Sequence, residues 1–371
     1  MILKGFLGPS NRTRALVYDN ERSVNIYPEM PDAGSPKSEL AQTIRPGLIP
    51  RWLLPAGPIR GLFYQDGRFF AVAGTTFCEL FPNYTYTTHG NVALDANPAT
   101  ISSNGNGGFQ LFITSGGLGY VFALNTDTFS QIGSSGFPSP VIMGDFCDGY
   151  SVVLKTNSNQ FNLSELEDSL TWSGLSVAQT SESSDNKIAL IVNHRELWLF
   201  GTLRTEVWVN TGDAGFPFQP IPGTLIEHGI IAPFSAKRLD NTIVWLGGDE
   251  RGGNVVFRAN GYTPERISTF GIENTLNNLA RTSDAIAWTY QQAGHAFYCL
   301  YLPANDTTLV YDVSTNLWHE QGIWVPDEVR WIPHPGRCHA FAFDSRHFCG
   351  DRSSSIVYEM DLNRHYDELA A

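Results

Sequence analysis

A three-strand unit that recurs along the chain limits the choice of fold more than any other feature of this sequence. In its clearest copy, residues 188–209, two apolar runs at 188–193 and 197–201 flank the charged turn His194-Arg195-Glu196, and a third run follows at 205–209. Val, Ile, Leu, Trp and Phe dominate the runs, and each run is too short for a globular helix. The segment therefore predicts an antiparallel meander.

Looser copies of this unit give seven in all. Their central strands are spaced roughly 40 to 54 residues apart and begin near Phe69, Phe109, Tyr150, Leu197, Ile243, Phe297 and His347. A β-propeller blade is a four-stranded sheet of about 40–50 residues, and repetition at this period is its sequence signature. We predict an all-β chain that folds as a β-propeller of seven blades, with six and eight blades as the alternatives.

The repeats also divide the chain. The propeller is assigned to 59–361, after an irregular, Pro-rich N-terminal segment 1–58 that is a candidate for closing the ring, and before a C-terminal tail 362–371. Each unit has three clear strands, so a fourth is expected in the linking segments 85–89, 130–133, 217–220, 263–269 and 317–321. Short helices are expected only near 164–169, 273–281 and the C-terminal residues.

Charge and cysteine content exclude several classes of protein. The chain has 37 acidic and 24 basic residues, a formal net charge of -13. Phosphate binding needs clustered Lys and Arg, so adhesion to free nucleic acid or anionic membrane is disfavoured, whereas a channel through which DNA passes without sequence-specific binding remains open. The five cysteines are dispersed, and we find no secretory signal and no membrane span. A reducing cytoplasm is the expected place of synthesis.

No known catalytic motif is present, so we expect no enzymatic activity and no cofactor. The alternative is a glycan-binding or glycan-cleaving propeller, which would use acids at strand ends: Asp145, Glu206, Asp249, Asp312, Asp344 and Asp351. A zinc site at His334, His339 and His347 with Cys338 and Cys349 matches no known ligand spacing. The tryptophans are expected to pack between blades: Trp172, Trp198, Trp208, Trp245, Trp288, Trp318, Trp324 and Trp331.

Charged residues on successive turns form the remaining candidate site. They are Arg195, Arg204, Glu206, Lys237, Arg238 and Arg251. One interpretation is ordinary solvated turn charge, which needs no partner. The other is contact with a neighbouring subunit, because complementary charges fix register in assemblies.

Several short motifs, in order, resemble one known family. They are Val24-Asn25-Ile26-Tyr27-Pro28-Glu29, Arg45-Pro46-Gly47-Leu48, Ile59-Arg60-Gly61-Leu62, Asn193-His194-Arg195-Glu196-Leu197-Trp198-Leu199-Phe200-Gly201, Thr205-Glu206-Val207-Trp208, Glu227-His228-Gly229-Ile230, Leu309-Val310-Tyr311-Asp312 and Cys349-Gly350-Asp351-Arg352-Ser353. With the stretches 243–261 and 267–269, they resemble the tail hub proteins of short-tailed bacteriophages, also called packaged-DNA stabilisation or head-completion proteins and related to tail nozzle proteins. The similarity covers most of the chain.

The resemblance implies a virion structural protein of the tail hub or nozzle, assembled in the host cytoplasm. Copies would form a ring, expected to be a hexamer, that continues the DNA exit channel below the portal or head-tail adaptor protein. There they would retain packaged DNA and carry a tail fibre, spike or needle protein. Members of this group often continue into a further β domain that helps to form the ring, whereas this sequence ends at Ala371. That part would be supplied otherwise or be absent.

Overall fold

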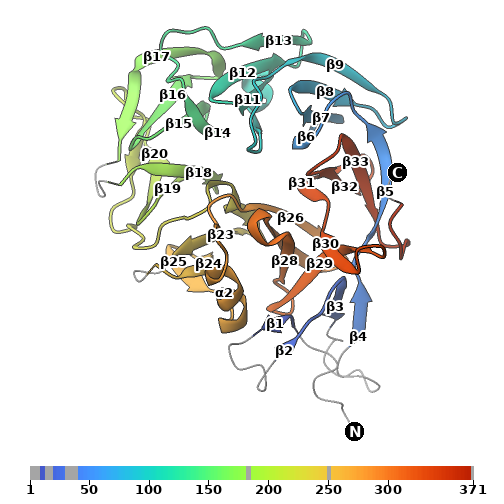
Figure 1. Cartoon of the computed structure of the whole chain (residues 1–371). Helices are drawn as coiled ribbons and strands as arrows, with labels where there is room; N and C mark the ends of the chain where they lie inside the picture. Colours follow the sequence, from blue (N-terminus) through green and yellow to red (C-terminus); the bar gives the residue numbers. More distant parts are fainter. Residues whose placement is uncertain (1–8, 13–19, 30–40, 181–184, 249–251, 369–371) are drawn as a thin grey trace.

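The computed structural model describes residues 9–12, 20–29, 41–180, 185–248 and 252–368. Seven antiparallel sheets are arranged around a common axis, as the view along that axis shows (Figure 1). Each sheet runs from an inner strand at the axis to an outer strand at the rim. The chain is a seven-bladed β-propeller, so the predicted fold class is confirmed.

Strand order is sequential in blades one to six. The first four blades consist of β6 Ile59–Gln65, β7 Arg68–Ala73, β8 Thr76–Leu80 and β9 Tyr86–Asn91; β10 Thr100–Ser103, β11 Gln110–Ser115, β12 Leu118–Ala123 and β13 Thr128–Gln131; β14 Val141–Cys147, β15 Tyr150–Lys155, β16 Gln160–Glu165 and β17 Asp168–Gln179; β18 Lys187–Asn193, β19 Glu196–Gly201, β20 Thr205–Asn210 and β21 Phe218–Pro220.

Two of the remaining three blades depart from the simple pattern. Blade six has a fifth strand, and blade seven takes its outer strand from the N-terminal part of the chain. The three consist of β22 Lys237–Leu239, β23 Thr242–Gly248, β24 Asn254–Asn260 and β25 Thr263–Arg266; β26 Ile286–Gln292, β27 His295–Leu302, β28 Thr307–Asp312, β29 Leu317–Val325 and β30 Arg330–Pro333; β31 Gly336–Ala342, β32 Arg346–Asp351, β33 Ile356–Asp361 and β5 Gly47–Leu53.

Other elements lie outside the blades. Two small hairpins form from β1 Asn11–Arg12 with β2 Asn20–Glu21 and from β3 Ile26–Glu29 with β4 Ala41–Ile44, and the helical pieces are α1 Gly105–Gly108, α2 Phe270–Asn277, η1 Pro233–Ser235 and η2 Pro303–Asn305. In the described parts of the chain, no helix has the length and apolar character that crossing a membrane requires.

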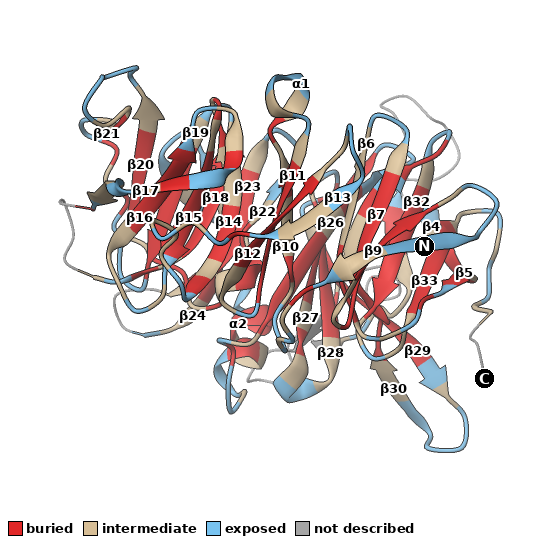
Figure 2. Cartoon of the chain, turned by 90° about the horizontal axis from the view of Figure 1, so that it is seen from above, coloured by how far each residue is buried: buried red, intermediate tan, exposed pale blue. Residues whose placement is uncertain are grey.

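Tight turns and side chains packed between blades account for this architecture. Asp66-Gly67 and Asp148-Gly149 have positive φ at both residues, the backbone that two-residue hairpin turns require. The inner and middle strands are buried on both faces, because each blade packs against its two neighbours (Figure 2). Such strands appear in sequence as continuous apolar runs without strict alternation.

The propeller closes through β5, which pairs along the outer edge of β33. Trp52 of β5 is 1% exposed and packs edge-on against Phe348 of β32, with ring centroids 5.1 Å apart. An edge strand left open would present unpaired N–H and C=O groups. The N-terminal part of the chain therefore completes the last blade.

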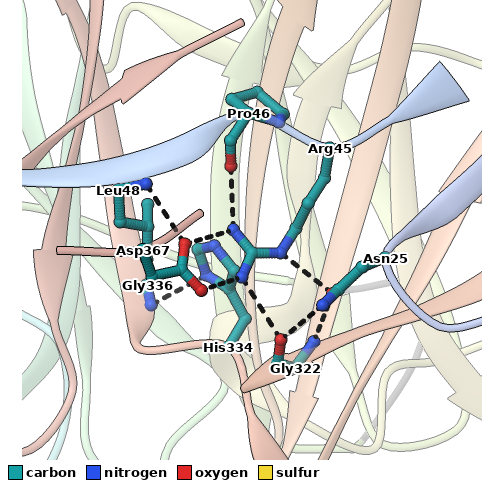
Figure 3. Close-up of polar contacts among 8 residues, drawn as sticks. All are labelled: Asn25, Arg45, Pro46, Leu48, Gly322, His334, Gly336 and Asp367. Carbon is teal, nitrogen blue, oxygen red and sulfur yellow. Dashed lines mark hydrogen bonds and ion pairs between the residues drawn. The ribbon is translucent and has the colours of Figure 1, made fainter. Parts of the chain in front are cut away.

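Arg45, directly before β5, joins both ends of the chain (Figure 3). Its guanidinium makes two parallel bonds to Asp367, at 2.6 and 3.0 Å, and Asp367 also accepts from Leu48 N at 3.2 Å. Arg45 Nε donates to Asn25 Oδ1 at 2.9 Å, and the Asn25 amide brackets the Gly322 backbone in β29. We call this group the closure latch.

Local helix predictions fared unevenly. Residues 164–169 were expected to form a helical turn, but they form the end of β16, a tight turn at Glu167 with positive φ, and the start of β17. That prediction was wrong because the hairpin of blade three decides the local conformation. The helix expected at 273–281 begins earlier, at Phe270, where the Thr269 side chain caps Ile272 N. Residues 362–368 are not helical.

Candidate functional site

The centre of the propeller contains a cavity of about 300 Å³ that all seven inner strands line. Each blade begins with its inner strand, so the seven inner strands run in the same direction and start at one mouth. Residues that start these strands therefore gather at that mouth, which we call the entry mouth.

Basic side chains dominate the cavity wall. Arg60, Lys237, Arg238 and Arg337 line it, and Asp145 is the single carboxylate among the lining residues of the described chain. Three of the four cations, Arg60, Lys237 and Arg337, are at the starts of β6, β22 and β31 and thus at the entry mouth. This local excess of positive charge contrasts with the net charge of -13 for the whole chain.

Arg60 and Arg337 occupy equivalent positions in adjacent blades. The register of each inner strand shifts at that residue, between Ile59 and Gly61 and between Gly336 and Cys338, so each arginine is the extra residue of a β-bulge. A bulge bends the strand and re-aims its side chain. The two side chains are 0% and 6% exposed.

Both arginines hold the connection between blades one and two, residues 92–99, through its carbonyl oxygens. Arg60 donates to Asn97 O at 2.9 Å and Ala93 O at 3.2 Å, and Arg337 donates to Ala96 O. Burial is the main cause that lowers the pKa of each guanidinium, and the nearby Asp95 opposes it. The positive charges are thus met mostly by neutral carbonyls.

The opposite mouth has paired charges. Arg238 bonds to Asp145 Oδ2 at 2.5 Å and to the Val192 carbonyl, which joins blades five, three and four. Arg195, in the turn between β18 and β19, bonds to Asp148 Oδ1 at 2.6 Å, and its side chain is 81% exposed. Here each cation has a carboxylate partner.

The structure separates the residues predicted as subunit contacts. Arg195 and Arg204 are exposed, whereas Lys237 and Arg238 line the cavity, and Arg251 lies outside the described residues. Glu206 is 1% exposed and its Oε1 lies 3.3 Å from Lys187 Nζ, so in the folded chain it offers no surface contact. The sequence interpretation placed it at a turn because both faces of its strand are buried and no alternation marks it as interior.

The candidate acids of a glycosidase do not converge. Asp145 binds Arg238, Asp312 binds His295 at 2.7 Å, and Asp351 accepts from the backbone and hydroxyls of the turn that follows it. Asp344 is exposed, Glu206 is buried, and Asp249 lies outside the described residues. Each described member thus has its own local role.

The candidate zinc residues lie in blade seven and just before it. His339 Nε2 is 3.0 Å from His347 Nδ1, so these rings bond to each other. Within the described ranges, no group of three or more His, Cys, Asp or Glu residues is arranged to hold a metal ion.

A projecting hairpin in blade six is the most exposed apolar feature. Strands β29 and β30 extend beyond the body of the propeller (Figure 2), with Trp324 opposite Trp331 and their ring centroids 5.5 Å apart. Trp324 is 43% exposed and Val329 at the tip is 73% exposed. Six of the eight tryptophans considered above are buried as expected, but Trp324 is exposed because this fifth strand has no neighbouring blade.

A groove of about 500 Å³ runs beside this hairpin. Trp324, Arg330 and Trp331 line one part, and Arg22 and α2 line others. Arg22 is tied to Glu320 of β29 at 2.7 Å. The groove and hairpin together form a surface that a single propeller leaves uncovered.

Residues 7–365 match a protein family described as bacteriophage P22 Gp10, β-propeller. The chain belongs to this family. The match supports a bacteriophage structural or stabilisation role, as the sequence motifs implied. No curated protein sequence matches the chain.

Solved structures show similarity of fold alone, at low identity. A streptogramin B lyase is 11% identical with a TM-score of 0.54, covering 85% of this chain and 97% of the lyase. Virginiamycin B lyase from Staphylococcus aureus is 12% identical with a TM-score of 0.53, covering 82% and 95%. The N-terminal domain of Nup159 is 11% identical with a TM-score of 0.50, covering 96% and 99%.

Sequence reasoning missed Arg60 and Arg337 as residues of the central cavity. Both stand beside a glycine at the start of a blade, in Ile59-Arg60-Gly61 and Gly336-Arg337-Cys338. A charged residue next to glycine within an apolar inner strand is a signal of a bulge, and it marks both positions in this family member.

Proposed function

We propose that this protein is a non-catalytic structural subunit of a bacteriophage tail. Copies form a ring, a hexamer in our proposal, below the portal or head-tail adaptor. The ring continues the DNA exit channel, retains packaged DNA and carries a fibre, spike or needle protein. The family match over residues 7–365 is the observation that carries this proposal.

Three features of the molecule support an assembly role. The β29–β30 hairpin presents Trp324 and Val329 to solvent, and aromatic anchors are typical of protein interfaces. The exposed Arg195 and Arg204 are suited to acidic partners on adjoining subunits. An acidic chain also gives passing DNA little to adhere to.

The DNA channel in this proposal is enclosed by several subunits. The central cavity of one propeller, about 300 Å³, has the size of a small-molecule site. A DNA duplex therefore passes between subunits rather than through a blade ring.

Particles assembled without this protein provide the test. We expect heads that package DNA but leave it open to added nuclease, and particles without tail attachments. Supplying the chain in trans restores nuclease resistance. Nuclease-resistant, fully tailed particles that lack the protein, as judged by mass spectrometry of purified virions, would overturn the proposal.

A further inference from the structure

The entry mouth of the central cavity carries more positive charge than the protein around it neutralises. Arg60, Arg337 and Lys237 contribute three cations, and Asp95 is the carboxylate that acts on both arginines. Buried charges in folded proteins are ordinarily paired, because leaving an ion uncompensated at low dielectric costs several kcal/mol. An acceptor of negative charge is therefore missing from this mouth.

Unused donors indicate where such an acceptor binds. Arg60 Nη2 and Arg337 Nε are buried and have no acceptor among the described residues. The half-buried Lys237 Nζ likewise has no hydrogen-bond or ion-pair partner in the part of the chain that the structure describes. Buried donors without partners are rare and mark sites for water, ions or ligands.

The two arginines are adjacent and rigidly placed. Cys338 Sγ, next to Arg337, lies 3.8 Å from the carbonyl oxygen of Ile59, next to Arg60. Each guanidinium is anchored to carbonyls of residues 92–99, so its position is fixed before any ligand arrives. Preorganised donors bind an anion without an ordering cost.

We propose that the entry mouth binds a small oxyanion, a phosphate or a compact polycarboxylate, between Arg60, Arg337 and Lys237. Guanidinium groups match the geometry of phosphate and carboxylate oxygens, and an ammonium adds a compact point charge. The cavity of about 300 Å³ admits an anion of this size. This site is separate from the assembly role, so either proposal can fail without the other.

The anion also explains the placement of Lys237. Burial lowers the pKa of this lysine, and the neighbouring Arg238 adds to that effect. A bound anion favours the charged form of the lysine and opposes both influences. It also bridges blades one, seven and five across the axis of the ring.

Titration calorimetry and thermal unfolding of the full chain test this proposal. Inorganic phosphate and citrate are added separately at constant ionic strength, with sodium chloride as the reference. We expect saturable heat and a saturable rise in Tm with at least one of them. The tighter of the two identifies the class of ligand. Heat and Tm changes no larger than those of sodium chloride with both anions overturn the proposal.

Variants locate the site. Lys237→Met removes the half-buried ammonium and is expected to weaken binding about tenfold, the loss of one charge-assisted bond. Lys155→Met, at an exposed lysine of β15, is the matched control and keeps wild-type affinity. Arg337→Met is expected to abolish binding. If Arg337→Met fails to fold, Lys237→Met still decides: unchanged affinity in Lys237→Met places the anion elsewhere and refutes the site.

Discussion

At the scale of single residues, blade four contains a buried ion pair whose partners have no exposed side-chain surface. Lys187 Nζ lies 3.3 Å from Glu206 Oε1 and 3.1 Å from Asp185 Oδ1. Trp208 Nε1 donates to Glu206 Oε2 at 3.3 Å. The pair links strands β18 and β20 across β19, so it fixes the sheet from within.

Glu206→Gln leaves the buried ammonium of Lys187 with less negative charge nearby. We expect a loss of about 3–5 kcal/mol in the free energy of unfolding, because breaking a buried pair strands the other ion. Urea denaturation measures this loss. Glu196→Gln is a matched control, since Trp198 donates to partly exposed Glu196 with the same spacing and distance. An equal effect in both variants would contradict the argument.

Replacing both ions tests the same pair differently. Lys187→Met with Glu206→Leu removes both charges and keeps similar volume. Such replacements are often neutral or stabilising, because no ion then needs desolvation. We expect the double variant to recover most of the stability that Glu206→Gln loses.

Buried histidines make the fold sensitive to acid. His319 is 1% exposed, and burial, with the charge of His295, lowers its pKa from 6.5 to about 3; burial also holds the pKa of His334 well below 6.5. Between the two pKa values the unfolded chain binds more protons than the folded chain, so stability falls as pH falls below about 6.5. At pH 4.5 the loss from His319 alone is about 2.7 kcal/mol.

The urea midpoint at pH 7.5 and at pH 4.5 checks this expectation. His319→Phe keeps an aromatic ring among Tyr27 and Phe297 and removes the titrating group, so its stability should depend less on pH. His365→Asn, at an exposed position, should behave as the wild type does. An unaltered pH dependence in His319→Phe would count against a neutral buried His319.

At the scale of elements, the sequence predicts the local parts well and the non-local parts poorly. Asp148-Gly149 between two apolar runs identifies a hairpin, because only a few residue types favour positive φ at both turn positions. The 85–89 and 217–220 segments do overlap fourth strands, β9 and β21. By contrast, the pairing of β5 with β33 joins residues about 300 positions apart, and no local pattern encodes that partner.

The candidate site shows the same limit. Exposed Arg195 follows from its place in a turn, but Arg60 and Arg337 are buried in runs that resemble any inner strand. Burial of both strand faces removes the period-two pattern that would show which side a charged residue occupies. The exposure of Trp324 depends on a fifth strand without a covering blade, which only the assembled ring reveals.

The closure latch is an element-scale device that can be weakened at one residue. Asp367→Asn removes the negative charge that faces the 4%-exposed Arg45 side chain but leaves the carbonyls of Pro46 and Gly322 as acceptors. We expect a loss of about 2 kcal/mol, the size of a charged hydrogen bond. Thermal denaturation measures it. Arg364→Gln, which loses the exposed pair with Glu368, serves as control and should cost less than about 1 kcal/mol.

At the scale of the whole molecule, self-association should depend on the projecting hairpin. Trp324→Ala with Trp331→Ala shortens exposed and half-exposed rings, so we expect the propeller to fold with little change in Tm. If the hairpin is an interface anchor, the dissociation constant of the ring rises at least about tenfold. Sedimentation over a range of concentrations measures it. Leu203→Ala removes an equally exposed apolar side chain on blade four and should leave assembly unchanged.

Net charge governs how the molecule meets DNA. With 37 acidic and 24 basic residues, the isolated chain repels the phosphate backbone at long range, and its cavity-lining arginines are held inside the ring. Non-specific DNA binding comes from neutralised phosphates and weakens steeply with salt. We therefore expect no measurable binding of duplex DNA at about 1 μM protein in 50 mM salt, by fluorescence anisotropy. Binding that is tight in 50 mM salt and lost in 200 mM would reveal a basic surface and contradict a channel wall that lets DNA slide.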